Sequence, residues 1–519
     1  MISDNQLPPG WMEAPLPDVA DINPPNPGDL PEDSAPVSFV PMAAVEALSG
    51  RLDASNMRPW SQVRKGYTRF QDGDVLFAKI TPCMENGKAA VARGLLHGVG
   101  AGSTEFHVLR PSNALRPELL LHYVLQEQFR KSARAQMTGT AGQLRVPSRF
   151  LDEQTIPVPP LPEQHRMVEA IESYFTRLDD AVATLERAQR NLKRYRAAVL
   201  KAAVEGRLVP TEAELARAEG RSYEPASVLL ERIGVERRRR WEEAELARMT
   251  GRGKAPKDDR WKAKYVEPVA PDTSELPELP EGWCWASVQQ VAALVTDGDH
   301  NPPKRSATGI PHLTAKSVKR WMLTLEGCSY LSEEAFEKTR ARYEPIEGDL
   351  IVTCVGTVGE CAIVPPGLVF SADRNLAAIR LVHPGVLSKF ALYFLSSSRV
   401  QAAIRAASGS TAQPHLYLGD LRALAIPLPP RDEQERIVGE IERLVSEEQA
   451  ASQLIAMSIS RLARLRQSIL KWAFEGRLVD QDPTDEPASV LLERIRAERA
   501  SATRQPARPR QRKARTTPP

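Results

Sequence analysis

Two polar loops carry side chains suited to reading a nucleic acid base. TGTAGQLRVPS occupies residues 138–148, and SGSTAQPHLYLGD occupies residues 408–420. Their glycines permit close backbone approach, their hydroxyls can bind phosphate, and the amides of Gln143 and Gln413 can each form two hydrogen bonds with adenine. Such composition is also common in surface loops without a ligand, so the loops alone are a weak indication. The candidate contacts from these loops are Thr140, Gln143, Arg145, Ser410, Gln413, His415 and Tyr417.

A second group of candidate contacts follows two strand-like segments that begin with Gly-Asp. AKITPCMENGK (residues 78–88) contains lysines that can act as point charges, and TCVGTVGE (residues 353–360) contains glycines whose backbone amides can approach a phosphate. A tight β-turn would explain the same glycines without a ligand. Two further motifs, ADRN (residues 372–375) and NPPKR (residues 301–305), contain arginine and lysine side chains that could contact DNA. The candidates from these segments are Lys79, Thr81, Asn86, Lys88, Lys304, Arg305, Thr357, Arg374 and Asn375.

Motifs for catalysis are missing from the sequence. It contains no GxxxxGK[ST] phosphate loop, no HExxH, and no convincing pair of carboxylates with a lysine for metal-dependent cleavage. NPP occurs twice, but Asn26 and Lys304 stand where the Asn-Pro-Pro-aromatic signature of adenine methyltransferases needs a ring to stack on an extruded base. No glycine-rich turn that would hold a nucleotide-like cofactor is present. We therefore expect a non-catalytic chain without a cofactor or metal of its own.

Composition narrows the class of protein. The 519 residues are enough for several cores, and the formal net charge of +3 is too small for the whole chain to act as a polycation. We expect a cytoplasmic protein with reduced cysteines, because no membrane span, secretory signal or zinc-ligand spacing is visible. For the arginines at residues 237–240 and the basic tail at residues 500–519, a solvated helix face and a disordered terminus are the ordinary explanations.

An internal repeat indicates which elements position the candidate loops. The repeated pairs are LPPGW and LPEGW (residues 7–11, 279–283), DGDVLF and EGDLIV (72–77, 347–352), IPVPPLPEQ and IPLPPRDEQ (156–164, 426–434), LKAAVEGRLV and LKWAFEGRLV (200–209, 470–479), and EPASVLLERI twice (224–233, 486–495). Similarity is dense in the helical parts and thin inside the globular parts. This contrast predicts a shared docking role for the helices and two different recognition roles for the globular domains.

Each IPxPP segment is followed by a heptad pattern that predicts a long helix, beginning near Glu163 in the first copy. A helix over residues 163–205 would be about 60 Å long. Polar residues within the pattern, Gln189, Glu448 and Ser452, would fix register at a cost in stability. Antiparallel pairing of the two helices is favoured; parallel pairing stays open, and an ordinary bundle does not explain five uninterrupted heptads. The predicted packing and partner-docking positions are Val168, Ile171, Phe175, Leu178, Val182, Leu185, Leu192, Val199, Val438, Ile441, Ile455, Ile459, Leu462 and Ile469.

The globular parts are predicted to be mixed α and β. Short strand-like runs are expected at residues 75–79, 350–353 and 377–382, and one helical pattern is expected in each domain, over residues 118–134 and 387–407.

Together these motifs resemble the specificity subunit of Type I restriction-modification enzymes. The resemblance covers about residues 7–499 and rests on the two IPxPP joints, EGRLV, EPASVLLERI, FAKITPCMENGK and DGDHNPPKRSATGIPHLTAKSV. It implies two target recognition domains, each reading one half of a bipartite double-stranded DNA site, with the helices setting the gap. The partners it implies are two methyltransferase subunits, which use S-adenosylmethionine, and restriction or motor subunits, which use ATP and Mg.

Carried onto this sequence, the resemblance places the loops around Gln143 and Gln413 against DNA, and the helices around Leu185 and Ile455 against partner subunits. The first copy departs from the second in having AGQ and a longer ITPCMENGK loop where the second has TAQ and VGTVG. This difference is compatible with different half-sites but puts individual base contacts in doubt.

The expected fold is therefore α+β: two globular mixed α/β target recognition domains separated by two long helices that form an antiparallel coiled coil, with an internal pseudo-twofold repeat. The expected parts are residues 1–160 (first recognition domain), 161–250 (central helical region), 251–278 (linker), 279–430 (second recognition domain), 431–499 (C-terminal helical region) and 500–519 (tail). Two alternatives stay open: a single-chain enzyme that combines methylation with recognition, and a coiled-coil adaptor that never reads DNA.

Overall fold

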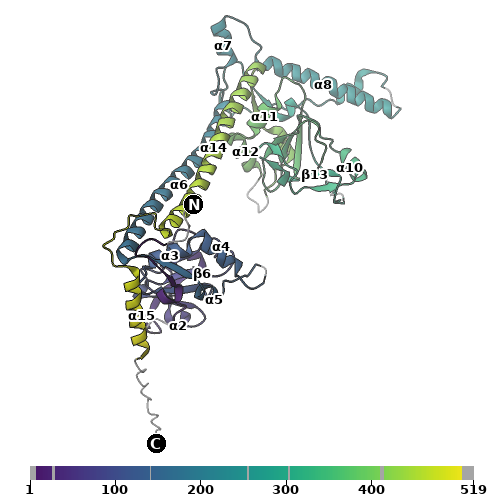
Figure 1. Cartoon of the computed structure of the whole chain (residues 1–519). Helices are drawn as coiled ribbons and strands as arrows, with labels where there is room; N and C mark the ends of the chain where they lie inside the picture. The colour runs from purple at the N-terminus through teal and green to yellow at the C-terminus, as the bar shows by residue number, and fades with distance from the viewer. Residues whose placement is uncertain are drawn as a thin grey trace, which may run out of the picture. The chain divides into compact units, whose positions relative to one another are not determined.

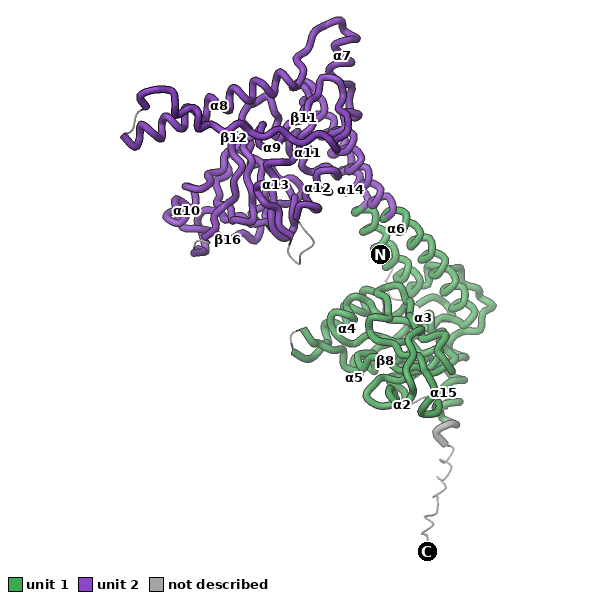
Figure 2. Tube along the Cα trace, turned by 180° about the vertical axis from the view of Figure 1, so that it is seen from behind, with its two compact units in different colours: residues 1–186, 456–519 green, residues 187–455 purple. Residues whose placement is uncertain are grey.

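The computed structural model describes residues 7–25, 30–140, 142–253, 256–301, 304–408 and 414–504. The chain forms two compact units (Figure 2). Unit 1 consists of Met1–Glu186 with Ala456–Pro519, and unit 2 consists of Arg187–Ile455. Each unit contains one globular domain and a part of each long helix, so the units are not the two sequence copies.

The globular domain of unit 1 is built on two four-stranded sheets (Figure 1). The first is antiparallel, in the order β2 (Ala20–Ile22), β9 (Phe106–Pro111), β6 (Val75–Ala78) and β7 (Ala89–Val91). The second has the order β4 (Met57–Pro59), β3 (Pro36–Val40), β8 (Val99–Gly102) and β5 (Thr68–Gln71), with β3 and β8 parallel. Strand β6 is buried on both faces, since Val75 and Phe77 enter one core and Leu76 and Ala78 enter another.

The globular domain of unit 2 repeats the antiparallel sheet. Its strands have the order β12 (Ala292–Asp297), β20 (Leu376–Leu381), β17 (Leu350–Thr353) and β18 (Cys361–Ile363). The three predicted strand-like runs correspond to β6, β17 and β20, within one residue at each end. The smaller sheets contain β16 (Ser329–Leu331), β13 (Ile310–Leu313) and β19 (Ser371–Ala372), and β14 (Val318–Lys319) with β15 (Met322–Leu323). The repeat is therefore present in the sheet even where the sequence similarity is thin.

Each predicted helix inside a globular domain is in fact two helices. Residues 118–134 form α3 (Pro117–Val124) and α4 (Glu127–Ala135), and residues 387–407 form α11 (Ser388–Leu395) and α12 (Ser398–Ala407). Extended backbone at Gln126 and at Ser397 separates the members of each pair. The break has a packing reason, because α3 and α11 are buried on most sides whereas α4 and α12 bury two residues each.

Short elements complete the two domains. Those of unit 1 are β1 (Met12–Pro15), α1 (Leu16–Val19), η1 (Met42–Ala44), α2 (Trp60–Val63), η2 (Leu96–Gly98), α5 (Ser148–Asp152) and β10 (Thr155–Val158). Those of unit 2 are β11 (Cys284–Ser287), α9 (Val288–Val291), η4 (Ala315–Ser317), α10 (Glu333–Arg340), α13 (Leu418–Ala423) and β21 (Ala425–Leu428). The pairs β1–β10 and β11–β21 connect the start of each domain to the IPxPP segment at its end.

The long helices are α6 (Leu161–Val204), which lies within two residues of the predicted range 163–205, and α14 (Arg431–Phe474). Their antiparallel pairing is visible within each unit: Asp179 pairs with Arg466 in unit 1, and Arg196 pairs with Glu448 in unit 2. All predicted packing positions are buried or half-buried. The buried ones are Val168, Ile171, Phe175, Leu178, Val199, Val438, Ile441 and Ile469; the half-buried ones are Val182, Leu185, Leu192, Ile455, Ile459 and Leu462. The helical seam predicted from the heptads is confirmed.

The repeated EPASVLLERI segment packs on the domain of the other copy. In α8 (Ala226–Gly251), Leu229 and Ile233 enter the core of unit 2, which includes strands from residues 284–428. In α15 (Ala488–Arg504), Leu492 and Ile495 enter the core of unit 1 with the N-terminal domain. Each copy therefore contributes its last helix to the globular domain that the other copy encodes.

The region between α6 and the second domain contains α7 (Glu212–Glu219), α8 and η3 (Asp259–Lys264). In η3, within the segment expected to be a linker, Trp261 stacks on Trp241 of α8 with 6.0 Å between ring centroids. The arginines at residues 238–240 are exposed and pair with glutamates of the same helix, as a solvated helix face requires. No helix in the described ranges is long and apolar enough to cross a membrane.

A histidine in the core of unit 1 makes a testable contribution to acid stability. His122 on α3 is buried, its ring meets Phe175 edge-on, and neither nitrogen has a hydrogen-bond partner among the described residues. Burial lowers the pKa of His122 to about 4, from an ordinary value near 6.5. Between these two pH values the unfolded chain binds a proton that the folded protein excludes.

We expect this histidine to reduce the free energy of unfolding by about 3 kcal/mol as the pH falls from about 6.5 to about 4. Denaturant unfolding over this pH range should show a flatter profile for His122→Phe than for the wild type. Burial also lowers the pKa of His312 in unit 2 to about 4. Because His312 is present in both proteins, its contribution to the pH dependence of unfolding is the same in both. Parallel pH profiles would contradict the assignment to His122.

Candidate nucleic-acid interface

The EQ pair at the start of each long helix fastens that helix to a globular domain. The indole Nε1 of Trp11 donates to Glu163 at 2.9 Å, and that of Trp283 donates to Glu433 at 2.9 Å. Both carboxylates are buried, and burial raises the pKa of each. The tryptophans are those of LPPGW and LPEGW, so these two repeated motifs form one joint.

The glutamine of each EQ pair binds the backbone just before a buried helix, α3 in the first domain and α11 in the second. Gln164 accepts the backbone N–H of Arg116 at 3.0 Å, and Gln434 accepts that of Leu387 at 3.0 Å. Each side-chain amide also donates to two backbone carbonyls. The repeated motifs at the joint thus position the domains and leave recognition to other residues.

The aspartate of each Gly-Asp segment is also a framework residue. Asp74 forms two hydrogen bonds with Arg110, at 2.7 and 2.8 Å, and Asp349 forms two with Arg380, at 2.9 and 2.7 Å. Both carboxylates are buried. These pairs connect neighbouring strands of the repeated sheet, which explains why the Gly-Asp segment appears in both copies.

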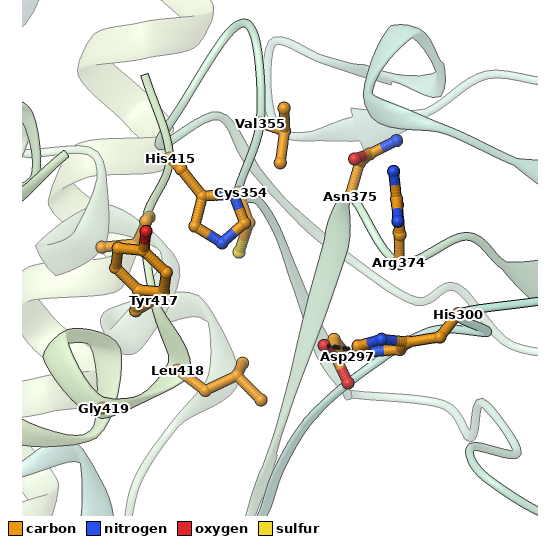
Figure 3. A pocket seen from close by; sticks show the side chains of 11 residues that line it. Asp297, His300, Cys354, Val355, Arg374, Asn375, His415, Tyr417, Leu418 and Gly419 are labelled. Atoms are coloured by element: carbon orange, nitrogen blue, oxygen red, sulfur yellow. Dashed lines mark hydrogen bonds and ion pairs between the residues drawn. The ribbon is translucent and has the colours of Figure 1, made fainter. Parts of the chain in front are cut away.

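A cavity of about 690 Å³ lies in the second globular domain, and Figure 3 shows the side chains that line it. Four loops line it: the end of β12, the turn after β17, the segment before β20 and the segment leading into α13. The structure brings together four of the predicted contacts here: Arg374, Asn375, His415 and Tyr417. These residues come from two separate motifs of the sequence.

The cavity walls are held by backbone and side-chain hydrogen bonds. Leu416 donates its backbone N–H to the carbonyl of Cys354 at 2.8 Å, which joins two of the loops. Asn375 donates its side-chain amide to Asp373 at 2.9 Å. The rings of His415 and Tyr417 lie 4.4 Å apart between centroids, and Tyr417 is 63% exposed.

Three polar residues of this region were not among the contacts predicted from the sequence. Asp297 ends β12 and faces the cavity, and His300 Nε2 lies 2.7 Å from its carboxylate. Arg342 contacts the same carboxylate and donates from Nε to the Asp297 carbonyl at 3.2 Å. Burial acts to raise the pKa of Asp297, but hydrogen bonds from Arg342 and His300 hold it below its ordinary value. The DGDH letters were the available signal: they contributed to the family resemblance, but candidate contacts were chosen only from the NPPKR that follows them.

The first globular domain has different chemistry at the matching place. Arg145 makes a bidentate ion pair with Glu105, at 2.8 and 3.0 Å, and also donates to the Gln143 carbonyl at 3.1 Å. The two predicted loops of this domain are joined, because Val146 donates to the Lys79 carbonyl and Thr81 donates to the Leu144 carbonyl. Thr140 and Gln143 are exposed at the tip.

The remaining predicted contacts are dispersed. Lys88 donates to the carbonyl of Met42 at 2.9 Å, while Asn86 is exposed. Lys304, Arg305 and Thr357 are exposed and do not line the cavity. Ser410 and Gln413 lie outside the described residues. DNA contact by any of these side chains stays a prediction. Within the described ranges no group of three or more His, Cys, Asp or Glu side chains is arranged to hold a metal.

Comparison with protein families identifies a matching model, described as the Type I restriction modification DNA specificity domain. It matches residues 8–188 and 301–455, more than half of the chain. The Type I restriction enzyme EcoAI specificity subunit of Escherichia coli is 28% identical over 492 residues, covering 85% of this chain and 78% of that protein. The EcoKI specificity subunit of Escherichia coli K12 is 25% identical over 411 residues, covering 76% of this chain and 74% of that protein.

Two solved structures share the fold. The HsdS subunit from Thermoanaerobacter tengcongensis aligns with a TM-score of 0.51 over 92% of this chain and 99% of its own, at 21% identity. A chain from a study of complex assembly and conformational transition of the type I R-M system aligns with a TM-score of 0.63. That alignment covers 91% of this chain and 100% of the other, at 21% identity.

Proposed function

Because the chain belongs to the family of Type I restriction-modification DNA specificity subunits, we propose that each of its target recognition domains reads one half of a bipartite double-stranded DNA site. The observation that carries this proposal is the contrast between the two domains. They share a strand order, yet at matching loops one presents the Arg145–Glu105 pair and the other a cavity with Arg374 and His415. One scaffold with two different polar surfaces suits two different sequences.

The position of these groups also fits base reading. Base edges are recognised by hydrogen bonds from side chains that a rigid scaffold presents, whereas phosphates are bound mainly by cations and backbone amides. The segments that contain Arg145 and His415 are joined to the ends of β6 and β17, because Val146 donates to the Lys79 carbonyl and Leu416 to the Cys354 carbonyl. Both strands are buried. The alternative of a coiled-coil adaptor without DNA readout receives no support from the relatives, which are named specificity subunits.

In this proposal the chain performs no catalytic step and holds no cofactor. Two methyltransferase subunits would dock on the long helices and supply chemistry with S-adenosylmethionine, and restriction or motor subunits would use ATP and Mg. The half-buried middle of the seam, around Leu185 and Ile455, offers apolar surface for such docking. A place in the cytoplasm, where host DNA is found, is part of the same proposal.

Footprinting tests the bipartite site directly. The chain assembled with methyltransferase subunits should protect two patches of duplex DNA that flank an unprotected spacer. A single patch, or none, would overturn the proposal.

Matched arginine variants test which domain reads which half. Arg145→Ala should relax base discrimination in one half-site by about 1 to 3 kcal/mol, and Arg374→Ala should do so in the other half-site. Binding competition with duplexes that differ at single base pairs measures both. If either variant weakened binding equally for all sequences, that arginine would be a phosphate contact and not a base reader.

A further inference from the structure

The cavity in the second recognition domain is a concave receptor, and its shape restricts what it can bind. In B-DNA the major groove is about 8.5 Å deep, so stacked bases are read by elements that protrude into it. The hollow in this domain, about 690 Å³ and lined by four loops, has room for a whole nucleobase. A base that swings out of the helix can enter such a hollow.

We propose that this cavity holds a single nucleobase extruded from the second half-site. The proposal rests on the function proposed above and adds a ligand to one of its two domains. The base would lie against Tyr417 and His415, with its polar edge toward Asp297, Arg374 and Asn375 (Figure 3).

The aromatic side of the cavity supplies a stacking surface. Tyr417 is 63% exposed although its ring lies beside His415. Stacking of a base on an aromatic ring contributes about 1 to 3 kcal/mol and needs no particular base. Leu416 and Leu418, which also line the cavity, add apolar contact next to these rings.

The polar side of the cavity selects the kind of base. The Asp297 carboxylate is an acceptor, and Asn375 presents its amide oxygen because its amide nitrogen is bound to Asp373. Arg374 is a donor with no hydrogen-bond or ion-pair partner among the described residues. Acceptors next to a donor match adenine, cytosine and guanine, each of which carries an amino group near an acceptor, whereas thymine has no amino group.

The reading groups are held in place before any base arrives. His300 and Arg342 both bind Asp297, and Arg342 also bonds its carbonyl. A carboxylate bound by two neighbouring side chains keeps its direction, which favours selection of one base over tight binding of any base.

Among the described residues, the matching loops of the first recognition domain present a different arrangement. Arg145 and His415 occupy equivalent positions, because each forms an isolated β-bridge, Arg145 with Ile80 and His415 with Val355. Glu105 and Asn375 are also equivalent, since each directly precedes a strand, β9 and β20 respectively. The Arg145–Glu105 ion pair thus joins the two positions that in the second domain line the cavity. Base extrusion is therefore expected in the second half-site.

A mismatch scan tests the proposal. The full chain, assembled with its methyltransferase partners, is titrated with duplexes that carry the host's methylated site. Each base of the second half-site in turn faces an abasic position. Weakened pairing lowers the cost of extrusion, so binding should tighten at least about fivefold when one base of the second half-site, other than thymine, faces the abasic position.

Variants then assign that gain to the cavity. Tyr417→Ala and Asp297→Asn should abolish the gain, and Tyr417→Phe, which retains the ring, should retain it. Met322→Ala is the matched control, because Met322 is exposed in the same domain and does not line the cavity. A base extruded by the methyltransferase subunit would show the same gain in every variant.

The outcomes separate this proposal from the function on which it rests. If the two half-sites are still discriminated but no gain depends on Tyr417 or Asp297, the extruded-base proposal is wrong and sequence recognition stands. If the assembled protein does not discriminate either half-site, both are wrong.

Discussion

Removal of one heptad from each long helix is expected to abolish recognition of the original spacer while leaving both half-sites unchanged. The change deletes residues 182–188 from α6 and residues 456–462 from α14. Seven residues shorten a helix by about 10 Å, and base pairs are about 3.4 Å apart, so the preferred spacer should become shorter by at most about three base pairs. A whole heptad keeps the seam on the same face of each helix.

Both deletions lie between the Asp179–Arg466 and Arg196–Glu448 pairs, so both ion pairs are retained. Binding to a library of spacer lengths, with constant half-sites, measures the result. Affinity for the original spacer should fall by about 10³-fold or more, the interval between specific and non-specific DNA binding.

Deletion from α6 alone is the control: it breaks the register between the two interhelical ion pairs and should lower the melting temperature. Full affinity for the original spacer after the double deletion would refute the role of the helices as a ruler.

Arg196→Ala is expected to destabilise unit 2 by about 2 to 3 kcal/mol. Its partner Glu448 occupies a seam position with only 5% of the side chain exposed, so the variant leaves a buried carboxylate without its cation. Arg196 itself is 29% exposed, which places the expected loss below that of a fully buried pair. Denaturant unfolding of the full chain measures the loss.

The equivalent arginine of the second copy is a matched control. Arg466 pairs with Asp179, whose side chain is 44% exposed, and lies 4.1 Å from the ring centroid of Phe175. Arg466→Ala leaves a carboxylate that water can solvate, so the electrostatic loss there should be smaller. The double variant Arg196→Met, Glu448→Leu should recover most of the stability, because an apolar pair replaces the buried ions. Equal losses at Arg196 and Arg466, with no recovery in the double variant, would refute the buried-charge explanation.

The long helices could be predicted from the sequence to within a few residues. Heptad periodicity is a local property, and it appears wherever one face of a helix is covered by another. Val168 and Ile171 at one end and Val438 and Ile441 at the other are buried as the pattern requires. The polar seam residue Glu448 was expected to fix register, and the structure pairs it with Arg196 of the other long helix.

The helices inside the globular domains were less predictable. The pattern at residues 118–134 continues across Gln126, and nothing in its periodicity shows that the chain becomes extended there. The break coincides with a change in burial, because three consecutive leucines of α3 are buried, whereas the buried residues of α4 are Phe129 and Ala133.

The candidate site was predictable in part. Arg374, Asn375, His415 and Tyr417 were selected for their chemistry in two separate motifs, and the structure places them around one cavity. Whether they touch DNA stays a prediction. Asp297 and His300 were not predicted, because the sequence of one short motif does not show how a carboxylate and an imidazole are oriented. Their orientation depends on a neighbouring side chain. That neighbour is Arg342, distant in the sequence.

By itself the sequence determined the repeat, the helical seam and the family resemblance, because each is written in the order of neighbouring residues. Only the tertiary structure decided how the repeat is used. EPASVLLERI is identical in both copies, so no local rule can say which globular domain it meets; burial of Leu229 in unit 2 and Leu492 in unit 1 decides it. The cavity likewise exists only where four loops from distant parts of the chain come together. Its chemistry is readable in the sequence, but its shape is a property of the fold.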